Sequence, residues 1–265
     1  MLICPVCGAP LHVGRTCAEC ASGHSFDIAK EGYINLLLTS KSGNSIGDDR
    51  LSARSRRDFL NRGYYAPLRD ALIEIFSSRS GSVLDICCGE GYYTSALAAN
   101  PALDVCGFDI AKEMIRLAAK RGGAHYYVAN MARMPFSDGS FDYATHLFAP
   151  FHEKEFFRVL RPGGRLTTVI PGSAHLFGLK KLLYDSPYLN DEQLPECSLL
   201  RFVSRQKVSA EICLETPEDI EAVFHMTPYY YHTSAFDRAK LSGVSSLVTP
   251  IEFVIGEYEK PPLDS

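Results

Sequence analysis

The sequence lacks the marks of membrane, fibrous and disordered proteins. No apolar stretch approaches the ~18 residues of a membrane-spanning helix. The 265 residues include only 20 glycines and 15 prolines, and 46% are hydrophobic, which excludes a collagen-like or wholly disordered chain. The N-terminus has no charged stretch followed by an apolar segment and a small-residue cleavage site, so no secretory signal is expected. We therefore expect a soluble, cytoplasmic protein without a membrane partner.

Positive charge is scarce overall but locally clustered. The formal net charge of −4 excludes a general polycation. Residues 50–69, however, contain six arginines and one aspartate, and residues 158–181 contain three arginines and two lysines with no acidic residue. Such clusters are typical of proteins that bind the phosphates of a polyanion. A solvated, arginine-rich helix face would give the same pattern, and charge alone does not separate the two interpretations.

Cysteine is unevenly distributed: four of the nine cysteines fall in the first twenty residues, with His12 and His24 nearby. Two Cys-x-x-Cys pairs so close together predict a zinc ion, because each pair presents two thiolates from one tight turn. Disulfides are the weaker alternative in the cytoplasm. The short segment builds little core, so a structural metal would supply folding energy. Two ligand sets remain, the first slightly favoured by spacing: Cys4, Cys7, Cys17 and Cys20, or Cys4, Cys7, Cys20 and His24.

Beyond these residues the chain alternates between helical and strand patterns. A helix capped by Asp48 or Asp49 would end at Gly63, and a second would cover residues 65–78. Repeated strand-helix units predict an α/β fold, in which a mostly parallel sheet is covered by helices on both faces. One further strand near the edge of the sheet is expected to run antiparallel. The expected strands are 82–88, 104–108, 125–129, 142–148, 165–170 and the antiparallel 248–258, with helices at 92–99, 112–120 and 153–160.

Polar residues follow the expected strands, at the edge where open α/β sheets bind ligands. The first strand leads into VLDICCGEGYYT, in which Gly89 and Gly91 let the backbone approach a ligand and Asp85 supplies an acceptor. The second ends at Asp109, whose carboxylate can accept from both hydroxyls of a ribose; alternatively it caps the next helix. Together with MPFSDGSFD and RVLRPGG further on, these motifs resemble the class I S-adenosylmethionine-dependent methyltransferases. The resemblance implies a Rossmann-like sheet and that cofactor.

A narrower resemblance includes the cysteine-rich module. It is carried by CPVC (4–7), CASGHSFDIAKEGYINLL (20–37), GYYAPLRDAL (63–72), LDICCGEGYYT (84–94), FAP (148–150) and PGSAHL (171–176). Over nearly its whole length the chain is similar to the RlmA family of 23S ribosomal RNA guanine-N1 methyltransferases. That family's zinc pattern implies the ligands Cys4, Cys7, Cys20 and His24, with Cys17 as an extra thiol. One departure is Cys87, which stands where the methyltransferase pattern has its first glycine.

The resemblance implies methyl transfer to ring nitrogen 1 of a guanine in a 23S ribosomal RNA hairpin loop. It divides the chain into a zinc-binding RNA-recognition module (1–47) and a methyltransferase domain (48–265), with 48–80 as a helical lead-in, and leaves a homodimer open. RNA phosphates would contact Arg54, Arg56 and Arg57. The implied cofactor-binding residues are Tyr65, Asp85, Gly89, Glu90, Gly91, Asp109, Asn130, Met131 and His175.

Several assignments have plainer alternatives. Tyr65 could join a helix to the core, and His175 could be a surface residue at a helix N-terminus. No general base is assigned, because His152, Glu153 and His175 are candidates by location only. A small-molecule methyltransferase would share the sheet but leave the zinc module without a task. A noncatalytic RNA-binding protein would need neither Asp85 nor the glycine loop.

Overall fold

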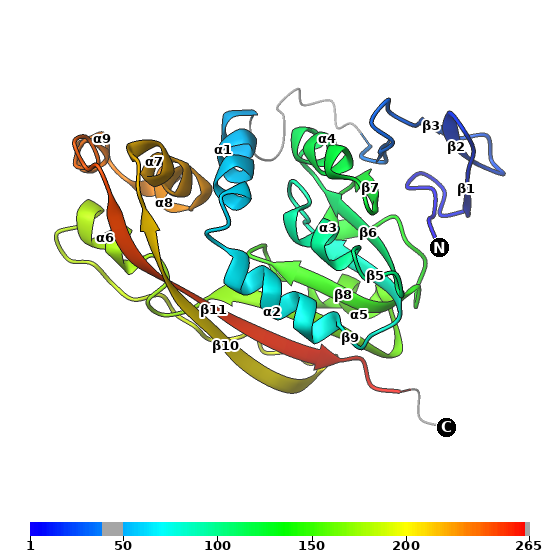
Figure 1. Ribbon diagram of the computed structural model, residues 1–265. Coiled ribbons are helices and arrows are strands. Elements are labelled where there is room, and N and C mark those ends of the chain that lie inside the picture. Colours follow the sequence, from blue (N-terminus) through cyan, green and yellow to red (C-terminus); the bar gives the residue numbers. More distant parts are fainter. Residues whose placement is uncertain (39–49, 263–265) are drawn as a thin grey trace.

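The computed structural model describes residues 1–38 and 50–262 and contains two sheets (Figure 1). In the eight-stranded main sheet the order is β10-β11-β9-β8-β5-β6-β7-β4, and every strand except β11 runs in the same direction. Its strands are β4 (Ile34–Asn35), β5 (Gly81–Ile86), β6 (Leu103–Asp109), β7 (His125–Val128), β8 (Phe141–Leu147), β9 (Leu160–Pro171), β10 (Arg201–Leu214) and β11 (Leu247–Glu259). The mostly parallel sheet with one antiparallel strand is confirmed.

Helices cover both faces of this sheet. The described helices are α1 (Arg50–Asn61), α2 (Ala66–Phe76), α3 (Tyr92–Leu97), α4 (Lys112–Arg121), α5 (Glu153–Val159), α6 (Phe177–Leu183), α7 (Pro217–Met226), α8 (Tyr229–His232) and α9 (Ala235–Ala239), with a 3-10 turn, η1 (Met131–Arg133). None of these helices is long and apolar enough to cross a membrane.

The strand sequences explain the two faces. Successive side chains of a strand point to opposite faces, and Val83 packs in the cluster that contains α2 and α3, while Leu84 packs in the cluster that contains α5. In α2 the apolar positions four residues apart, Leu68, Leu72 and Phe76, are buried as expected. Buried apolar runs such as 83–86 are typical of parallel strands covered on both sides.

Each expected element corresponds to an observed one, but the short strands β1–β4, which lie within residues 11–35, the helices α6–α9 and the strand β10 were not predicted. The antiparallel strand expected at 248–258 is β11, but its partner β10 was not predicted. Most of β10 is exposed and polar, so it shows no alternation that would mark a strand. The expected caps Asp48 and Asp49 lie outside the described residues.

The chain between β9 and β11 lies over one end of the sheet, where α6 to α9 gather on the side opposite the N-terminal module (Figure 1). Helix α7 packs against α1, and the Arg62 guanidinium contacts the buried Asp219 carboxylate across this interface. Thr216 caps α7 by accepting from the Asp219 backbone N–H. The sequence indicates no role for this region, which supplies one wall of a cavity.

The N-terminal module contains a three-stranded sheet of β1 (Leu11–Val13), β2 (Cys17–Cys20) and β3 (Ser25–Asp27). Its fourth strand, β4, instead extends the main sheet by pairing with β7. The Leu36 backbone N–H continues this pairing by donating to the Val128 carbonyl at 2.9 Å. On the other side, Ile3 N–H donates to the Pro135 carbonyl at 2.9 Å. The module is therefore attached to the sheet at two places.

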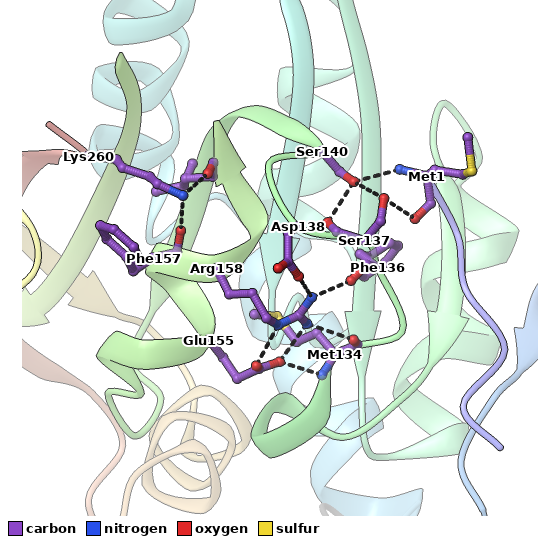
Figure 2. Close-up of polar contacts among 11 residues, drawn as sticks. Met1, Met134, Phe136, Ser137, Asp138, Ser140, Glu155, Phe157, Arg158 and Lys260 are labelled. Carbon is purple, nitrogen blue, oxygen red and sulfur yellow. Dashed lines mark hydrogen bonds and ion pairs between the residues drawn. The ribbon is translucent and has the colours of Figure 1, made fainter. Parts of the chain in front are cut away.

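Arg158 on α5 organises the loop that receives the first residues of the chain (Figure 2). Its guanidinium pairs with Glu155, at 2.7 Å, and donates to the carbonyls of Met134 and Phe136, at 2.9 and 2.5 Å. Ser137 N–H in turn donates to the Met1 carbonyl at 2.9 Å. The second basic stretch thus has structural partners: Arg161 pairs with Asp142 and Arg165 with Glu259. For these arginines the structure does not support the phosphate-binding interpretation.

Candidate active site and metal centre

Two turns of the N-terminal module bring four metal-binding side chains together. Cys4 and Cys7 belong to one turn, closed by a hydrogen bond from Gly8 N–H to the Cys4 carbonyl at 2.8 Å. Cys20 and His24 belong to the second, closed by Gly23 N–H and the Cys20 carbonyl at 3.0 Å. The four ligand atoms lie within 4.8 Å of one another.

The distances fit a tetrahedral zinc ion. Cys7 Sγ lies 3.7 Å from Cys20 Sγ, and His24 Nδ1 lies 3.4 Å from Cys20 Sγ. A tetrahedron with Zn–S bonds of about 2.3 Å separates two sulfurs by about 3.8 Å. Hydrogen bonding, first from the Ala9 backbone and then from the Ser22 side chain, lowers the pKa of the Cys7 thiol to about 6, which favours the thiolate that zinc requires.

Cys17 lies outside this cluster. Its thiol donates to Glu19 Oε1 at 3.3 Å, and no disulfide joins any of the nine cysteines. The four-cysteine ligand set that spacing slightly favoured is therefore wrong, and the set with His24 is the one the fold assembles. With all four positions filled by protein, the site is structural and leaves none for a reactive water.

The glycine loop follows β5 and turns into α3. Gly91 has φ +82, and a Cβ atom there would meet the Ala118 Cβ at 2.8 Å, so the close packing of loop and α4 requires glycine. Cys87, in contrast, has φ 58, in the left-handed region that favours glycine. Its thiol reaches Met131 Sδ at 3.7 Å, and burial raises its pKa to about 12, so it is a protonated, poorly nucleophilic group.

Asp85 lies at the end of β5 with its carboxylate buried. Thr94 and Thr145 donate to its two oxygens, at 2.5 and 2.8 Å. Burial raises its pKa to about 6, although both threonine hydrogen bonds favour the charged form. Each oxygen thus already accepts one hydrogen bond from the protein. A ligand could only add a further hydrogen bond to an oxygen that is already paired.

Asp109 at the end of β6 accepts from the backbone on both sides. Gly89 N–H donates to its Oδ2 at 3.0 Å, and Ala111 N–H donates to its Oδ1 at 2.9 Å. The carboxylate therefore joins the glycine loop to the start of α4. Asn130 accepts from Ala132 N–H at 2.9 Å and begins η1, which carries Met131. These groups lie at the carboxyl ends of neighbouring strands β6 and β7, as the sequence predicts.

Glu90 in the glycine loop has a buried oxygen that could accept a hydrogen bond from a ligand. Its side chain is 1% exposed, and its Oε2 pairs with Arg121 at 2.6 Å. Its Oε1 is buried and has no hydrogen-bond partner among residues 1–38 and 50–262. A buried acceptor without a partner costs free energy unless a ligand donor meets it. Burial raises the pKa of Glu90, and Arg121 opposes that shift.

Two adjoining hollows lie at this end of the sheet. The glycine-loop pocket, about 50 Å³, is lined by residues that include Asp85, Cys87, Glu90, Arg56 and Phe148. Beside it lies a cavity of about 540 Å³, which shares Arg56 and Phe148 with the smaller pocket. We call this larger hollow the aromatic cavity. Its lining is Arg56, Tyr65, Phe148, Ala149, Ile170, Pro171, His175, His225, Met226, Thr227, Pro228, Tyr229 and Tyr231.

Tyr65 and His175 line the aromatic cavity and not the glycine-loop pocket. The Tyr65 hydroxyl lies 3.0 Å from His175 Nε2, and the Glu252 backbone N–H donates to His175 Nδ1 at 3.2 Å. Nδ1 therefore accepts, and Nε2 carries the proton that it donates to Tyr65. Both side chains are buried, and burial lowers the pKa of His175 to about 4. The surface alternative for His175 is wrong.

The loop after β8 lies between the two hollows. His146 is buried and neutral, since burial lowers its pKa to about 4, and its Nε2 donates to the Pro150 carbonyl at 3.1 Å. This contact fixes the FAP segment. Phe148 within it has φ 57, and the residue is 41% exposed. The sequence motif indicated this loop, but nothing in the sequence indicated Tyr229 and Tyr231, which come from a distant helix.

The three arginines expected at RNA phosphates do not share one environment. Arg54 is exposed, whereas Arg56 and Arg57 are half-buried. Arg56 lines both hollows, and both it and Arg57 act electrostatically on Glu90. Successive residues of a helix point about 100° apart, so neighbouring arginines cannot all face one ligand. Arg56 thus lies beside the glycine loop, where it can act on the cofactor site.

Two family models match separate parts of the chain. One described as "RlmA, N-terminal" matches residues 2–41, and one described as "Methyltransferase domain" matches residues 83–164. A solved structure, the YcgJ protein from Bacillus, covers 76% of this chain and 100% of that chain with 18% identity and a TM-score of 0.48, from which no substrate follows.

Two relatives that match about two thirds of this chain or more are named for the same activity. A Bacillus subtilis (strain 168) protein named "Putative 23S rRNA (guanine-N(1)-)-methyltransferase YxjB" is 36% identical over 71% of this chain and 70% of that protein. A Streptomyces fradiae protein named "23S rRNA (guanine(748)-N(1))-methyltransferase" is 35% identical over 66% of this chain and 65% of that protein. A demethylmenaquinone methyltransferase of Bacillus licheniformis matches only 44% of this chain, at 30% identity.

This chain combines the zinc-binding cluster with the methyltransferase sheet. A class I sheet of this kind uses S-adenosylmethionine, and the Cys and His cluster holds structural zinc. The chain belongs to the RlmA family of 23S rRNA guanine-N1 methyltransferases.

Proposed function

We propose that the protein transfers a methyl group from S-adenosylmethionine to ring nitrogen 1 of a guanine in 23S ribosomal RNA. The observation that carries the proposal is the aromatic cavity, which adjoins the glycine loop in a chain that also carries the zinc module. Its volume of about 540 Å³ lies within the usual range of pockets for small ligands, and nucleobases stack on aromatic rings such as Phe148 and Tyr229.

The cofactor would lie along the carboxyl ends of β5, β6 and β7. Its ribose hydroxyls would meet Asp109, its adenine Asn130 and Met131, and its ammonium group the free oxygen of Glu90, with Asp85 behind. The glycine-loop pocket of about 50 Å³ is too small for this ligand as it stands, so Arg56 and Phe148 must move when it binds. Tyr65 and His175 would then define the side of the site that faces the base.

The bound cofactor supplies a methyl group on a positively charged sulfur. The chain's own part is to hold the attacking nitrogen about 3 to 3.5 Å from that carbon, which supplies much of the acceleration. A guanine within a stem would first have to leave its stack, whereas a hairpin loop offers unstacked bases. We propose such a loop as the substrate, with the zinc module and Arg54 contacting its backbone. A homodimer stays a prediction.

The function is tested with an unmodified 23S rRNA transcript, the zinc-loaded protein and S-adenosylmethionine. We expect mass spectrometry of the digested RNA to find N1-methylguanine, and rRNA from a deletion strain to lack it at the same nucleotide. Methylation elsewhere, or none, would contradict the proposal. Transfer to a small quinone by the same preparation would favour the small-molecule alternative suggested by the demethylmenaquinone relatives. RNA binding without cofactor affinity would favour a noncatalytic protein.

Asp109 tests the cofactor assignment. Replacing it in Asp109→Ala removes the acceptor of Gly89 N–H as well as the proposed ribose contacts, and we expect S-adenosylmethionine affinity to fall roughly tenfold to a hundredfold. Asp104→Asn on the same strand, where the side chain is exposed, is the matched control. Calorimetry showing unchanged affinity for Asp109→Ala would remove this carboxylate from the cofactor site.

A further inference from the structure

Methylation of guanine N1 requires a proton acceptor, because the neutral base carries a proton on that nitrogen. Two residues named as candidates from their location, Glu153 and His175, are poor acceptors for this proton. The Glu153 carboxylate already accepts from the backbone N–H of Leu199 at 2.6 Å and from the Ser198 hydroxyl at 3.1 Å. His175 has hydrogen-bond partners on both ring nitrogens and a pKa of about 4.

The remaining candidate named by location, His152, does not line the aromatic cavity. Tyrosines keep their protons at neutral pH because their ordinary pKa is about 10, and burial raises the pKa of Tyr65 and Tyr229 further. Arg56 is a permanent cation. Among the described groups that line the cavity, His225 is therefore the one imidazole with a nitrogen that can accept a proton.

His225 is also well placed to pass a proton on. It lies in the last turn of α7, half-buried, with its ring stacked on Tyr230 at 4.3 Å between centroids. Neither ring nitrogen forms a hydrogen bond with the described residues, 1–38 and 50–262. Besides the aromatic cavity, the ring lines a second hollow of about 290 Å³ between α1 and α7, which is lined by acidic side chains that include Asp58, Glu218 and Glu221.

We propose that His225 is the general base of the methyl transfer, an inference that rests on the proposed function. The N1–H bond breaks and its proton goes to an imidazole nitrogen of His225. The N1 electron pair forms the new bond to the methyl carbon, while the pair of the breaking sulfur–methyl bond stays on sulfur. The imidazolium then releases its proton to water in the acidic hollow. Arg56, in the same cavity, stabilises the negative charge that builds on the guanine ring.

Several titratable and charged groups line the same two hollows as this imidazole. Helix α7 contributes Glu218 and Glu221 beside the buried Asp219, and α8 contributes the stacked Tyr230. Strand β10 presents the apolar Ile212 and Leu214 to the same cluster as α7. Other charged or titratable residues that line one of the two hollows include Arg56, Asp58, Arg62 and His175.

The test uses His225→Gln in the full-length, zinc-loaded protein, with His232→Gln, an exposed histidine of α8, as the matched control. Under single-turnover conditions with the 23S rRNA transcript, we expect His225→Gln to slow methyl transfer about 10²- to 10⁴-fold. Dissociation constants for S-adenosylmethionine and for the RNA should stay within twofold of wild type. In His225→Ala, added imidazole should restore part of the rate, which a merely structural role would not allow.

The pH profile separates the outcomes further. The wild-type rate should rise with pH to a plateau, and the deficit of His225→Gln should narrow at alkaline pH, where guanine N1 loses its proton unaided. A wild type that methylates guanine N1 while His225→Gln matches His232→Gln would overturn the role of His225 and leave the proposed function intact. A wild type that never methylates guanine N1 would overturn both.

Discussion

The N-terminal module and the main sheet differ in what holds them together. In the module the buried apolar cluster is small, and two of its members, Cys4 and Cys20, are themselves metal ligands. In the main sheet, strands such as β5 pack against α2 and α3 on one face and α5 on the other. A short segment cannot bury enough apolar surface to offset its conformational entropy, so the module depends on zinc while the sheet does not.

The largest expected effect would break this comparison directly. Cys20→Ser should abolish zinc binding and unfold the module, because structural zinc contributes on the order of 10 to 16 kcal/mol in small zinc domains. Hydrogen exchange should show lost protection in β1 and β2 and retained protection in β5 and β6. Cys17→Ser is the matched control and should keep both the metal and the protection. Metal analysis finding zinc in Cys20→Ser would contradict the ligand set.

Arg158 sharpens the comparison, because it belongs to the sheet domain yet holds the loop on which the first residues of the chain rest. Arg158→Met should leave Glu155 and two carbonyls without their donor, lowering the Tm by roughly 5 to 15 °C. Arg161→Met removes only a more exposed ion pair, 57% exposed on the arginine side, and should change stability by about 0 to 1 kcal/mol. Calorimetric scans with equal shifts in both variants would contradict this.

Asp85 shows that the sheet, unlike the module, tolerates a destabilising group at its ligand end. Burial raises the pKa of Asp85 to about 6. Since the folded pKa exceeds the unfolded value of about 3.9, the folded state binds this proton more tightly, and the charged form costs stability above about pH 6. Asp85→Asn should therefore be more stable than wild type at pH 7 by about 2 to 3 kcal/mol, and the difference should vanish between pH 6 and pH 4. Urea denaturation at pH 7 and pH 4 measures this difference in the free energy of unfolding. A difference that does not change with pH would show that the charged carboxylate does not destabilise the fold.

The smallest expected effect separates RNA contact from cofactor contact within α1. Arg54→Ala should weaken RNA binding, lower its salt slope by about 0.7 to 0.9, and leave S-adenosylmethionine affinity unchanged. Arg56→Ala should instead weaken cofactor binding, since Arg56 lines the glycine-loop pocket. An unchanged salt slope for Arg54→Ala would show that Arg54 does not contact RNA phosphates and belongs to a solvated helix face.

Sequence patterns predicted what depends on local order. Strand ends brought Asp85 and Asp109 to one edge because parallel strands share an orientation, and turn residues placed Cys4 beside Cys7. Spacing alone gave the wrong choice between Cys17 and His24, because the pairing of β1 with β2 between the two turns decides which side chains meet. Only the family resemblance indicated the correct set.

What could not be predicted depends on distant packing. Helices α7 and α8 bring His225 and Tyr229 to a cavity whose other wall, with Tyr65, lies more than 150 residues earlier in the chain. No periodicity in the sequence predicts that these distant segments lie together. The orientation of Arg56 could not be predicted either, because a cluster of arginines shows where charge lies along the chain but not which side of the helix each side chain faces.

The two edges of the main sheet are protected in different ways. At one edge, β10 presents charged side chains such as Arg205 and Lys207, which discourage strands of other molecules from adding to it. At the other, β7 is covered by β4 from the zinc module. If the module detached from the sheet, the backbone N–H and C=O groups of β7, which carries Tyr126 and Tyr127, would lose their partners. Strands of other molecules could then pair with β7. A shortage of zinc would then lead to aggregation of the protein, even while the methyltransferase sheet itself stayed folded.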